Sequence, residues 1–240
     1  MTPLHVGVAG VSAEGAALCY RTLCTEGPAF FGPYAHPEVT LHTPSFAEHV
    51  ACLERGDWAG VGALLLASAR KLAAVGADFV ICPDNTAHQA LPFVEPSSPI
   101  PWLHIAEVVA AEAAAHGYRK LGLTGTRWLT ESEVYPDKLA AHGIAWLRPD
   151  VAQRERLGRI IMDELVHGIR KPDSVAEIVA IVADLARRGC DAVVLGCTEL
   201  PLVIDETLSP LPPLDSTRLL ARAALRRAAT HEAVRPAASR

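Results

Sequence analysis

The chain of 240 residues has few aromatic side chains, few charges and no long apolar run. Aromatic residues make up 5% and charged residues 20%, whereas Ala, Val and Leu dominate, as is typical of helices and strands packed in layers. The net charge of −5 lacks the basic footprint of a nucleic-acid-binding protein. No apolar run reaches the roughly 18 residues needed to span a bilayer. We therefore expect neither nucleic acid nor membrane as a partner.

Sequence signals for export, metal and nucleotide are also missing. The amino terminus lacks the basic, apolar and cleavage regions of a signal peptide, so we expect a cytoplasmic protein. In that compartment the six cysteines are expected to be thiols. No double C-x-x-C and no H-x-x-x-H spacing occurs, and Gly7-x-x-Gly10 lacks the ending of a phosphate loop. The sequence therefore predicts no metal and no nucleotide cofactor.

Two distant parts of the chain repeat one pattern. Residues 72–86 match residues 185–199 at a constant offset of 113. Both contain a helix end, a Gly-x-Asp stop, a short apolar strand and then polar residues. Residues 6–11 resemble residues 121–126 at an offset of 115, again with a strand that runs into a glycine turn. Any α/β protein can repeat such short units, but two matches at nearly one offset favour paired halves.

The order of apolar segments predicts strands that alternate with helices. This alternation is typical of a parallel sheet flanked by helices, built here twice. We expect helices at 13–25, 58–75, 106–116, 131–142, 151–168, 173–188 and 216–229. The predicted domains are a first lobe of 1–104 completed by 212–240 and a second lobe of 105–211. The tail 231–240 is expected to be frayed.

Asp84 and Cys197 occupy equivalent places in the repeat, each after the carboxyl end of a strand. Ligands bind beyond that edge of an open parallel sheet, so two related halves would direct this carboxylate and this thiol at one cleft. Such a pair can remove and return a carbon-bound proton without a cofactor. The alternatives are a small buried hydrophobe for Cys197 and a helix cap for Asp84. Cys82, inside the strand, is expected in the core.

At these residues the sequence resembles the aspartate/glutamate racemases, amino-acid racemases that work without pyridoxal phosphate. The resemblance covers nearly the whole chain, and its most specific part is Gly196-Cys197-Thr198-Glu199-Leu200. Further matches are residues 7–16, 85–88, 103–107, 122–126 and 163–168. The resemblance implies two α/β lobes related by a pseudo-twofold axis, an active site in the cleft between the lobes, and no cofactor. It also leads us to expect a homodimer.

The resemblance assigns roles to the polar turns. The family's first cysteine normally stands directly before the Asn-Thr pair, where this chain has Asp84, and the second is intact as Cys197. His88 and Glu199 are implied to orient the catalytic turns. The side chains implied to bind the substrate are Ser12, His49, Asn85, Thr86, Thr126, His167 and Thr198. Local turn capping is the alternative for the Asn and Thr residues, and a surface charge is the alternative for Glu199.

The substrate's side chain is less well defined. The resemblance implies that members specific for acidic amino acids carry basic side chains in the loop after the second strand and near the Glu-Leu-Val-x-Gly segment. Here the nearest candidates are His49 and His167, with Lys171 close by. Histidine is only partly charged near neutral pH, so a fixed positive clamp is missing. The preference for aspartate or glutamate is not expected to follow the family. An exposed helical histidine is the alternative for either residue.

The exchange of Asp for Cys predicts asymmetric kinetics. At reference pKa values of about 3.9 for Asp and 8.5 for Cys, the pair rests as a carboxylate and a thiol. This state is ready to take a proton with Asp84 and to deliver one from Cys197. The opposite state lies roughly 6 kcal/mol higher unless the surroundings narrow the gap. We expect one enantiomer to react much faster, with no shift of the final ratio.

The sequence therefore predicts an amino-acid racemase or epimerase with Asp84 and Cys197 as opposed acid/base groups. One alternative is decarboxylation of a malonate-type acid or isomerisation of a small diacid, with Cys197 as the proton donor, as in the arylmalonate decarboxylases of the wider superfamily. The retained Asn-Thr-Ala-His turn favours the racemases. The other alternative is a binding protein that has lost catalysis.

Overall fold

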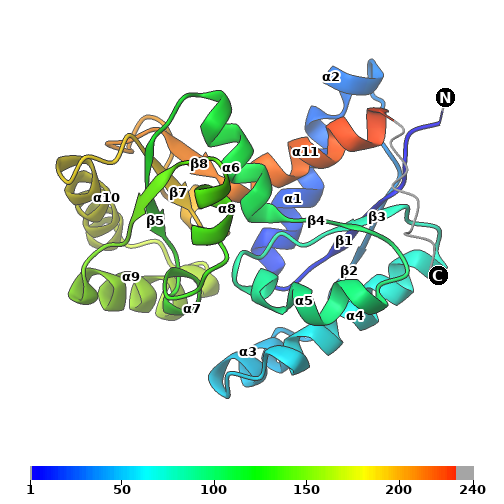
Figure 1. The fold of residues 1–240 in the computed structure, drawn as a ribbon, viewed down its shortest axis with the longest axis horizontal. Helices are drawn as coiled ribbons and strands as arrows, with labels where there is room; N and C mark the ends of the chain where they lie inside the picture. Colours follow the sequence, from blue (N-terminus) through cyan, green and yellow to red (C-terminus); the bar gives the residue numbers. More distant parts are fainter. Residues whose placement is uncertain (1, 231–240) are drawn as a thin grey trace. The chain divides into compact units, whose positions relative to one another are not determined.

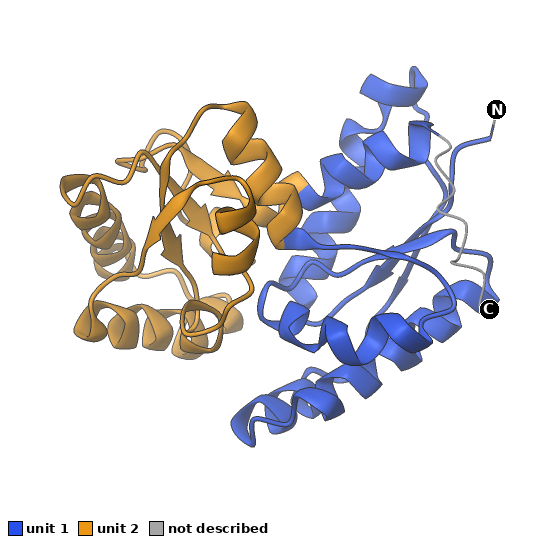
Figure 2. Ribbon diagram, viewed as in Figure 1, with its two compact units in different colours: residues 1–105, 220–240 blue, residues 106–219 orange. Residues whose placement is uncertain are grey.

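The computed structural model describes residues 2–230, and these form two compact units (Figures 1 and 2). Unit 1 contains the residues up to Ile105 and those from Leu220 onward, and unit 2 contains Ala106 to Leu219. The tail 231–240, for which fraying was predicted, lies outside the described residues. In the described part of the chain, no helix is both long enough and apolar enough to cross a membrane.

The elements follow one another in the alternating order that the sequence predicts. Unit 1 is built from β1 (Val6–Ala9), α1 (Ala13–Glu26), α2 (Pro28–Phe31), β2 (Val39–His42), α3 (Phe46–Glu54), α4 (Trp58–Ala74), β3 (Phe79–Ile81), η1 (Thr86–Ala90), α5 (Leu91–Val94), η2 (Glu95–Ser97) and β4 (Trp102–Leu103). Unit 2 is built mainly from β5 (Lys120–Thr124), α7 (Arg127–Thr130), α8 (Pro136–Ala141), β6 (Ala145–Leu147), α9 (Val151–Asp163), η3 (Leu165–His167), α10 (Pro172–Arg187), β7 (Ala192–Leu195), η4 (Leu200–Leu202) and β8 (Pro213–Asp215). Helices α6 (Ile105–Ala115) and α11 (Ser216–Thr230) contain the boundaries between the units.

Each unit holds one four-stranded parallel sheet. The strand order is β2-β1-β3-β4 in unit 1 and β6-β5-β7-β8 in unit 2, so the two sheets have the same topology. In unit 1, α4 and α5 lie on one side of the sheet, and α1 with the end of α11 lies on the other (Figure 1). The predicted fold class, α/β with two parallel sheets flanked by helices, is confirmed.

The sheet of unit 2 separates two apolar cores. Ala192 and Val194 of β7 pack with residues of α6 and α8, whereas Val193 and Leu195 pack with α9 and α10. Successive side chains of a strand point to opposite faces, so a strand covered on both faces is apolar throughout. This explains why the strand reads as a continuous apolar run rather than an alternating one.

Equivalent glycines let a helix approach each sheet closely. A β-carbon at Gly7 of β1 would lie 3.2 Å from the Leu72 side chain of α4, and one at Gly122 of β5 would lie 2.7 Å from the Leu185 side chain of α10. The two glycines are related by the offset of 115 and the two leucines by the offset of 113. The repeat seen in the sequence is therefore a repeat of packing.

In each unit an equivalent aspartate accepts hydrogen bonds from the backbone at the start of the central strand pair. In unit 1 the Asp78 carboxylate accepts a hydrogen bond from the His5 backbone N–H at 2.7 Å. In unit 2 the Asp191 carboxylate accepts from the N–H groups of Arg119 at 2.7 Å and Lys120 at 3.1 Å. These bonds satisfy backbone donors at the beginning of β1 and β5. The Gly-x-Asp stop of the sequence thus also sets the register of the neighbouring strand.

The structure corrects three details of the sequence prediction. The segment 212–219 belongs to unit 2, because β8 pairs with β7. Its prolines resemble a loop, but Pro213 is the first residue of an edge strand, where a missing N–H is tolerated. The helix expected at 151–168 ends at Asp163. Of the helix expected near 131–142, only Pro136–Ala141 is α-helical, as α8, and the short helix α7 ends before it at Thr130.

We predict that Asp191→Ala lowers the free energy of unfolding by about 1–3 kcal/mol, because two backbone donors lose their acceptor. Asp78→Ala should act in the same direction in unit 1. Urea denaturation followed by circular dichroism measures both. The exposed Glu206→Ala serves as the control and should leave the denaturation midpoint unchanged. Equal midpoints for the wild type and Asp191→Ala would show that this carboxylate does not hold the strand pair.

Candidate active site

The candidate residues follow the central strands of both sheets. In unit 1, Ser12 follows β1, and residues 84–86 follow β3; β1 and β3 are paired in parallel. In unit 2, Thr126 follows β5, and residues 197–199 follow β7; these strands are also paired in parallel. Parallel neighbours end at the same edge of a sheet. Each unit therefore gathers its own set of predicted polar residues at one edge.

The turn that contains Asp84 is held by a buried histidine. His88 is 2% exposed. Its Nδ1 lies 2.8 Å from the Asp84 carbonyl oxygen, and its Nε2 lies 3.1 Å from the Ile105 backbone nitrogen. Since Nε2 accepts the Ile105 N–H, the ring proton must be on Nδ1, where it is donated to the Asp84 carbonyl. His88 is neutral in this arrangement and ties the turn to the start of α6.

The side chains of this edge also make local caps. Asp84 is half-buried, and its Oδ1 accepts a hydrogen bond from the Ala87 N–H at 2.8 Å. Ser12 Oγ accepts from the Gly15 N–H at 3.2 Å and caps α1. The capping alternative is thus present for both residues. A carboxylate has two oxygens and about four acceptor positions, so capping by Oδ1 is compatible with chemistry at Asp84.

The neighbouring Asn85 and Thr86 are almost completely enclosed. Asn85 is 2% exposed and Thr86 is 8% exposed. Buried amide and hydroxyl groups are costly unless they are hydrogen-bonded. Their burial beside a half-buried carboxylate gives unit 1 a polar turn of fixed shape.

The turn that contains Cys197 depends on a close approach between backbones. Gly196 N–H donates to the Thr124 carbonyl oxygen at 3.0 Å. A β-carbon at Gly196 would lie 2.5 Å from the same oxygen and would collide with the Leu129 side chain. Gly125 on the neighbouring turn has a φ of +151° and faces the Gly196 carbonyl. Only glycine fits at position 196, and the close backbone contact there sets the position of the Cys197 backbone.

A buried carboxylate holds the Cys197 thiol. Glu199 Oε2 accepts hydrogen bonds from Cys197 Sγ at 2.9 Å and from Thr198 Oγ1 at 2.8 Å. Glu199 is 3% exposed, so the surface-charge alternative for this residue is wrong. The thiol is half-buried at the end of β7. A carboxylate in contact with sulphur favours the thiol over the thiolate, because two like charges would otherwise meet.

The two histidines predicted to bind the substrate differ in exposure. His49 of α3 is 1% exposed, and its Nε2 has no hydrogen-bond partner among the described residues. Burial lowers the pKa of His49, so the ring is neutral near pH 7. The exposed-helix alternative is therefore wrong for His49. His167, at the end of η3 in unit 2, is exposed.

Glu164 is a polar centre that sequence reasoning did not single out. Its residue is 7% exposed; its Oε2 accepts from Ser174 Oγ at 2.7 Å, and its Oε1 lies 3.3 Å from Lys171 Nζ. The Ser174 hydrogen bond and the Lys171 charge lower the pKa of the Glu164 carboxyl, and burial opposes them. Glu164 lies between α9 and η3, and these contacts link it to the start of α10. Lys171 is thereby engaged with Glu164.

No cluster suited to a metal ion stands out in residues 2–230, since no three His, Cys, Asp or Glu side chains converge there. Two candidate groups for acid/base chemistry lie in this part of the chain, a carboxylate in the Asp84 turn of unit 1 and a thiol in the Cys197 turn of unit 2. The repeated sheets and the polar turns at their carboxyl ends define the class: an α/β protein with a duplicated unit and one acid/base candidate in each.

The family follows from comparison with known proteins. Residues 8–224 match the sequence model of the Asp/Glu/hydantoin racemase family. This match covers most of the chain, and the protein belongs to the Asp/Glu/hydantoin racemase family.

Similar proteins agree with this assignment. The broad specificity amino-acid racemase RacX of Bacillus subtilis is 27% identical over 161 residues, which are 66% of this chain and 68% of that protein. A glutamate racemase of Thermus thermophilus is 28% identical over 220 residues, with 90% and 74% covered. The structure of an aspartate racemase homologue from Pyrococcus horikoshii has a TM-score of 0.79 at 28% identity, with 93% and 98% covered.

We predict that Gly196→Ala disrupts the Cys197 turn, because the new methyl group meets backbone and cannot be accommodated by a side-chain rotation. The free energy of unfolding should fall by about 1–3 kcal/mol, as for other overpacked sites. The control is Gly158→Ala, whose added β-carbon would meet no atom within 4 Å. Thermal denaturation of the two variants checks the contrast. A stable Gly196→Ala protein with an unchanged Cys197 environment would refute the close-approach explanation.

The pKa of Glu164 makes a prediction about pH. A carboxyl with a lowered folded pKa stabilises the fold above its unfolded pKa of about 4.5, and this contribution disappears as the pH falls through the lower folded value. Glu164→Gln should therefore be less stable than the wild type at pH 7, and the difference should shrink below about pH 4.5. Urea midpoints between pH 3 and pH 7 measure it, with Glu206→Gln as the control. A difference independent of pH would contradict the assignment.

Proposed function

We propose that the protein is an amino-acid racemase or epimerase that removes and returns the α-proton without a cofactor, with Asp84 and Cys197 on opposite faces of the substrate. Family membership supports the reaction class. The relatives named as racemases of glutamate and of a broad range of amino acids support an amino acid as the substrate. This proposal requires unit 1 and unit 2 to present their turns to one bound molecule.

The observation that carries the proposal is the Cys197 thiol held by the buried Glu199 carboxylate. A structural cysteine in a core needs no charged partner. Here the sulphur lies at a strand's carboxyl end, half-buried, with a carboxylate that keeps its proton in place. This arrangement suits a proton donor.

The reaction begins from an Asp84 carboxylate and a Cys197 thiol. Asp84 takes the α-proton from one face, and the electron pair of the broken C–H bond moves into the substrate's carboxylate as an enediolate. Cys197 then donates its proton to the other face, which forms the new C–H bond with inversion. The product state holds a protonated Asp84 and a Cys197 thiolate. Exchange of protons with water returns both groups to their starting forms.

The other predicted residues fit this scheme as binding groups. Asn85 and Thr86 in unit 1 and Thr198 in unit 2 would donate hydrogen bonds to the α-carboxylate, with Ser12 and Thr126 on adjacent turns. Donors placed on the enediolate oxygens lower the barrier, because charge develops on those oxygens. His88 and Glu199 act through the turns that they hold.

The thiolate that the reverse direction needs as its starting form would lie against the Glu199 carboxylate. Like charges in contact raise the energy of that state. The enantiomer that reacts with the Asp84 carboxylate should therefore be processed faster than its mirror image. The equilibrium between enantiomers stays at one to one, so the asymmetry must appear in both kcat and KM.

The test is incubation of L- and D-amino acids with the enzyme in deuterated water. The wild type should lose chirality and gain α-deuterium with at least one amino acid. Cys197→Ser and Asp84→Asn should each lower racemisation by about 10²-fold or more. Each variant should still exchange the α-hydrogen of a single enantiomer, and the two variants should act on opposite enantiomers. Cys24→Ser, a replacement in α1, is the control and should retain the wild-type rate.

Absence of both chirality loss and α-deuteration across the panel would overturn the proposal. Release of carbon dioxide from substituted malonates would instead favour the decarboxylase alternative, in which Cys197 only donates a proton. Saturable binding of an amino acid without turnover would favour a binding protein. The homodimer and the cytoplasmic location expected from the sequence are part of the same proposal.

A further inference from the structure

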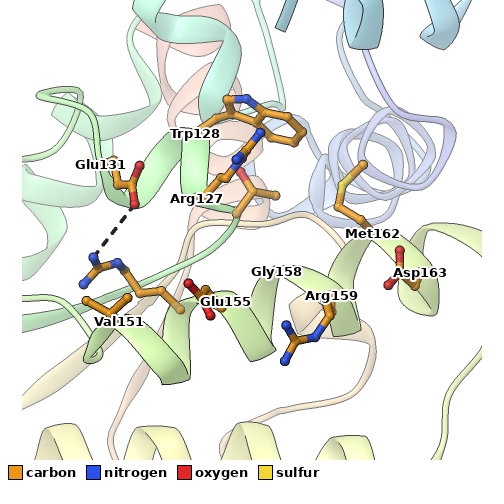
Figure 3. Close-up of a pocket in the computed structure, with 11 residues that line it drawn as sticks. Arg127, Trp128, Glu131, Val151, Glu155, Gly158, Arg159, Met162 and Asp163 are labelled. Atoms are coloured by element: carbon orange, nitrogen blue, oxygen red, sulfur yellow. Dashed lines mark ion pairs between the residues drawn. The ribbon is translucent and has the colours of Figure 1, made fainter. Parts of the chain in front are cut away.

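Unit 2 contains a cavity of about 410 Å³ between α7 and α9 (Figure 3). Its wall includes Thr126, one of the residues predicted to bind the substrate. The rest of the wall comes from α7, from Glu131 directly after it, and from α9. The cavity is therefore continuous with the edge of the sheet at which the candidate residues of unit 2 lie.

The Cys197 turn is a neighbour of this cavity. A β-carbon at Gly125 would lie 3.2 Å from the Gly196 carbonyl oxygen. Thr126 and Cys197 are the residues that follow this contact in the two turns. A ligand group held at Thr126 can thus extend into the cavity while its reacting carbon stays near the thiol turn.

The cavity wall combines apolar side chains with a glycine, which leaves open space beside α9. The Trp128 ring of α7 and the Met162 side chain of α9 both line it, and Met adapts readily to different ligand shapes. Gly158 lies inside α9, and a β-carbon there would meet no atom within 4 Å. Glycine inside a helix costs roughly 0.5–1 kcal/mol relative to alanine. Packing does not explain this glycine, whereas the approach of a ligand to the helix does.

The charges around the cavity balance one another. The wall contains Arg127, Arg154 and Arg159 and also Glu131, Glu155 and Asp163. Arg154 is paired with Glu131 at 3.8 Å, and the Arg127 guanidinium lies 5.1 Å from the centre of the Trp128 ring. A cavity wall with three charges of each sign has no net charge, so its overall field does not select a side-chain carboxylate. His49, the buried candidate of unit 1, is neutral near pH 7 and supplies no clamp either.

We propose that this cavity receives the side chain of the substrate, and that the substrate is an amino acid with a large side chain of no net charge. The inference rests on the proposed racemase function and specifies its substrate class. Trp128 and Met162 would contact the side chain, and Gly158 would give it room beside α9. Short or acidic side chains would leave these surfaces unused.

The experiment measures kcat/KM for α-deuteration of L- and D-forms of alanine, aspartate, glutamate, methionine and phenylalanine. The wild type should prefer methionine or phenylalanine to alanine, aspartate and glutamate by about tenfold or more. Gly158→Leu, which places a side chain in the cavity, should reduce the methionine-to-alanine ratio of kcat/KM by about tenfold or more. Ala152→Leu adds the same side chain at an exposed position of α9 outside the cavity wall and should keep the wild-type ratio.

Folding of the variants is checked by thermal denaturation, and Gly158→Ala should raise the midpoint because the helix gains a better former. A wild type that exchanges aspartate, glutamate or alanine best would overturn the inference and leave the racemase function intact. An unchanged methionine-to-alanine ratio in Gly158→Leu would do the same, whether or not the overall rate falls. A wild type inactive on every amino acid would overturn the racemase function and, with it, this inference.

Discussion

The parallel pairing of the two central strands in each sheet is the constraint on which the rest of each unit depends. Because β1 and β3 end at one edge, and β5 and β7 end at another, every polar turn after a central strand is directed to the same side of its own unit. Gly196 and Gly125 then bring two of these turns into backbone contact. The backbone geometry of each unit therefore sets the positions of the turns that carry the candidate side chains.

The two units repeat one scaffold but hold their turns by different chemistry. In unit 1 a neutral imidazole, His88, bonds two backbone groups, and the reactive candidate is a carboxylate. In unit 2 a carboxylate, Glu199, bonds two side chains, and the reactive candidate is a thiol. Each unit thus has a negative group at its turn, Asp84 in one and Glu199 in the other. The proposed mechanism uses this difference, since it begins with the proton on Cys197 beside Glu199 and with Asp84 as a carboxylate.

Much of the fold could be predicted from the sequence, because its signals were local and occurred twice. The Gly-x-Asp stops after α4 and α10 predicted both the helix ends and the strands that follow, and the equivalence of residues 72–86 with 185–199 predicted two similar sheets. The edge strand at Pro213 was missed, because proline normally argues against a strand and its pairing with β7 is not local. The break at Glu164 was missed as well, because it depends on the distant Ser174.

The candidate site was predictable only in part. Residues 84–86 and 197–199 could be named as candidates because they occupy equivalent places in the repeat and match a family pattern. The burial of Glu199 and of His49 could not be read from the sequence, since both residue types are ordinary on a surface and their enclosure comes from elements far along the chain. The cavity beside Thr126 was also hidden, because α7 and α9 meet only in the folded chain.

The most direct test of this account is a crystal structure of the protein with an amino acid whose α-hydrogen is replaced by a methyl group, which binds but cannot react. The account predicts that the α-carbon lies within about 4 Å of both the Asp84 carboxyl group and the Cys197 sulphur, with the two groups on opposite faces, as near-attack geometry requires. An α-carbon that contacts only one of the two groups, or that has both on the same face, would contradict it.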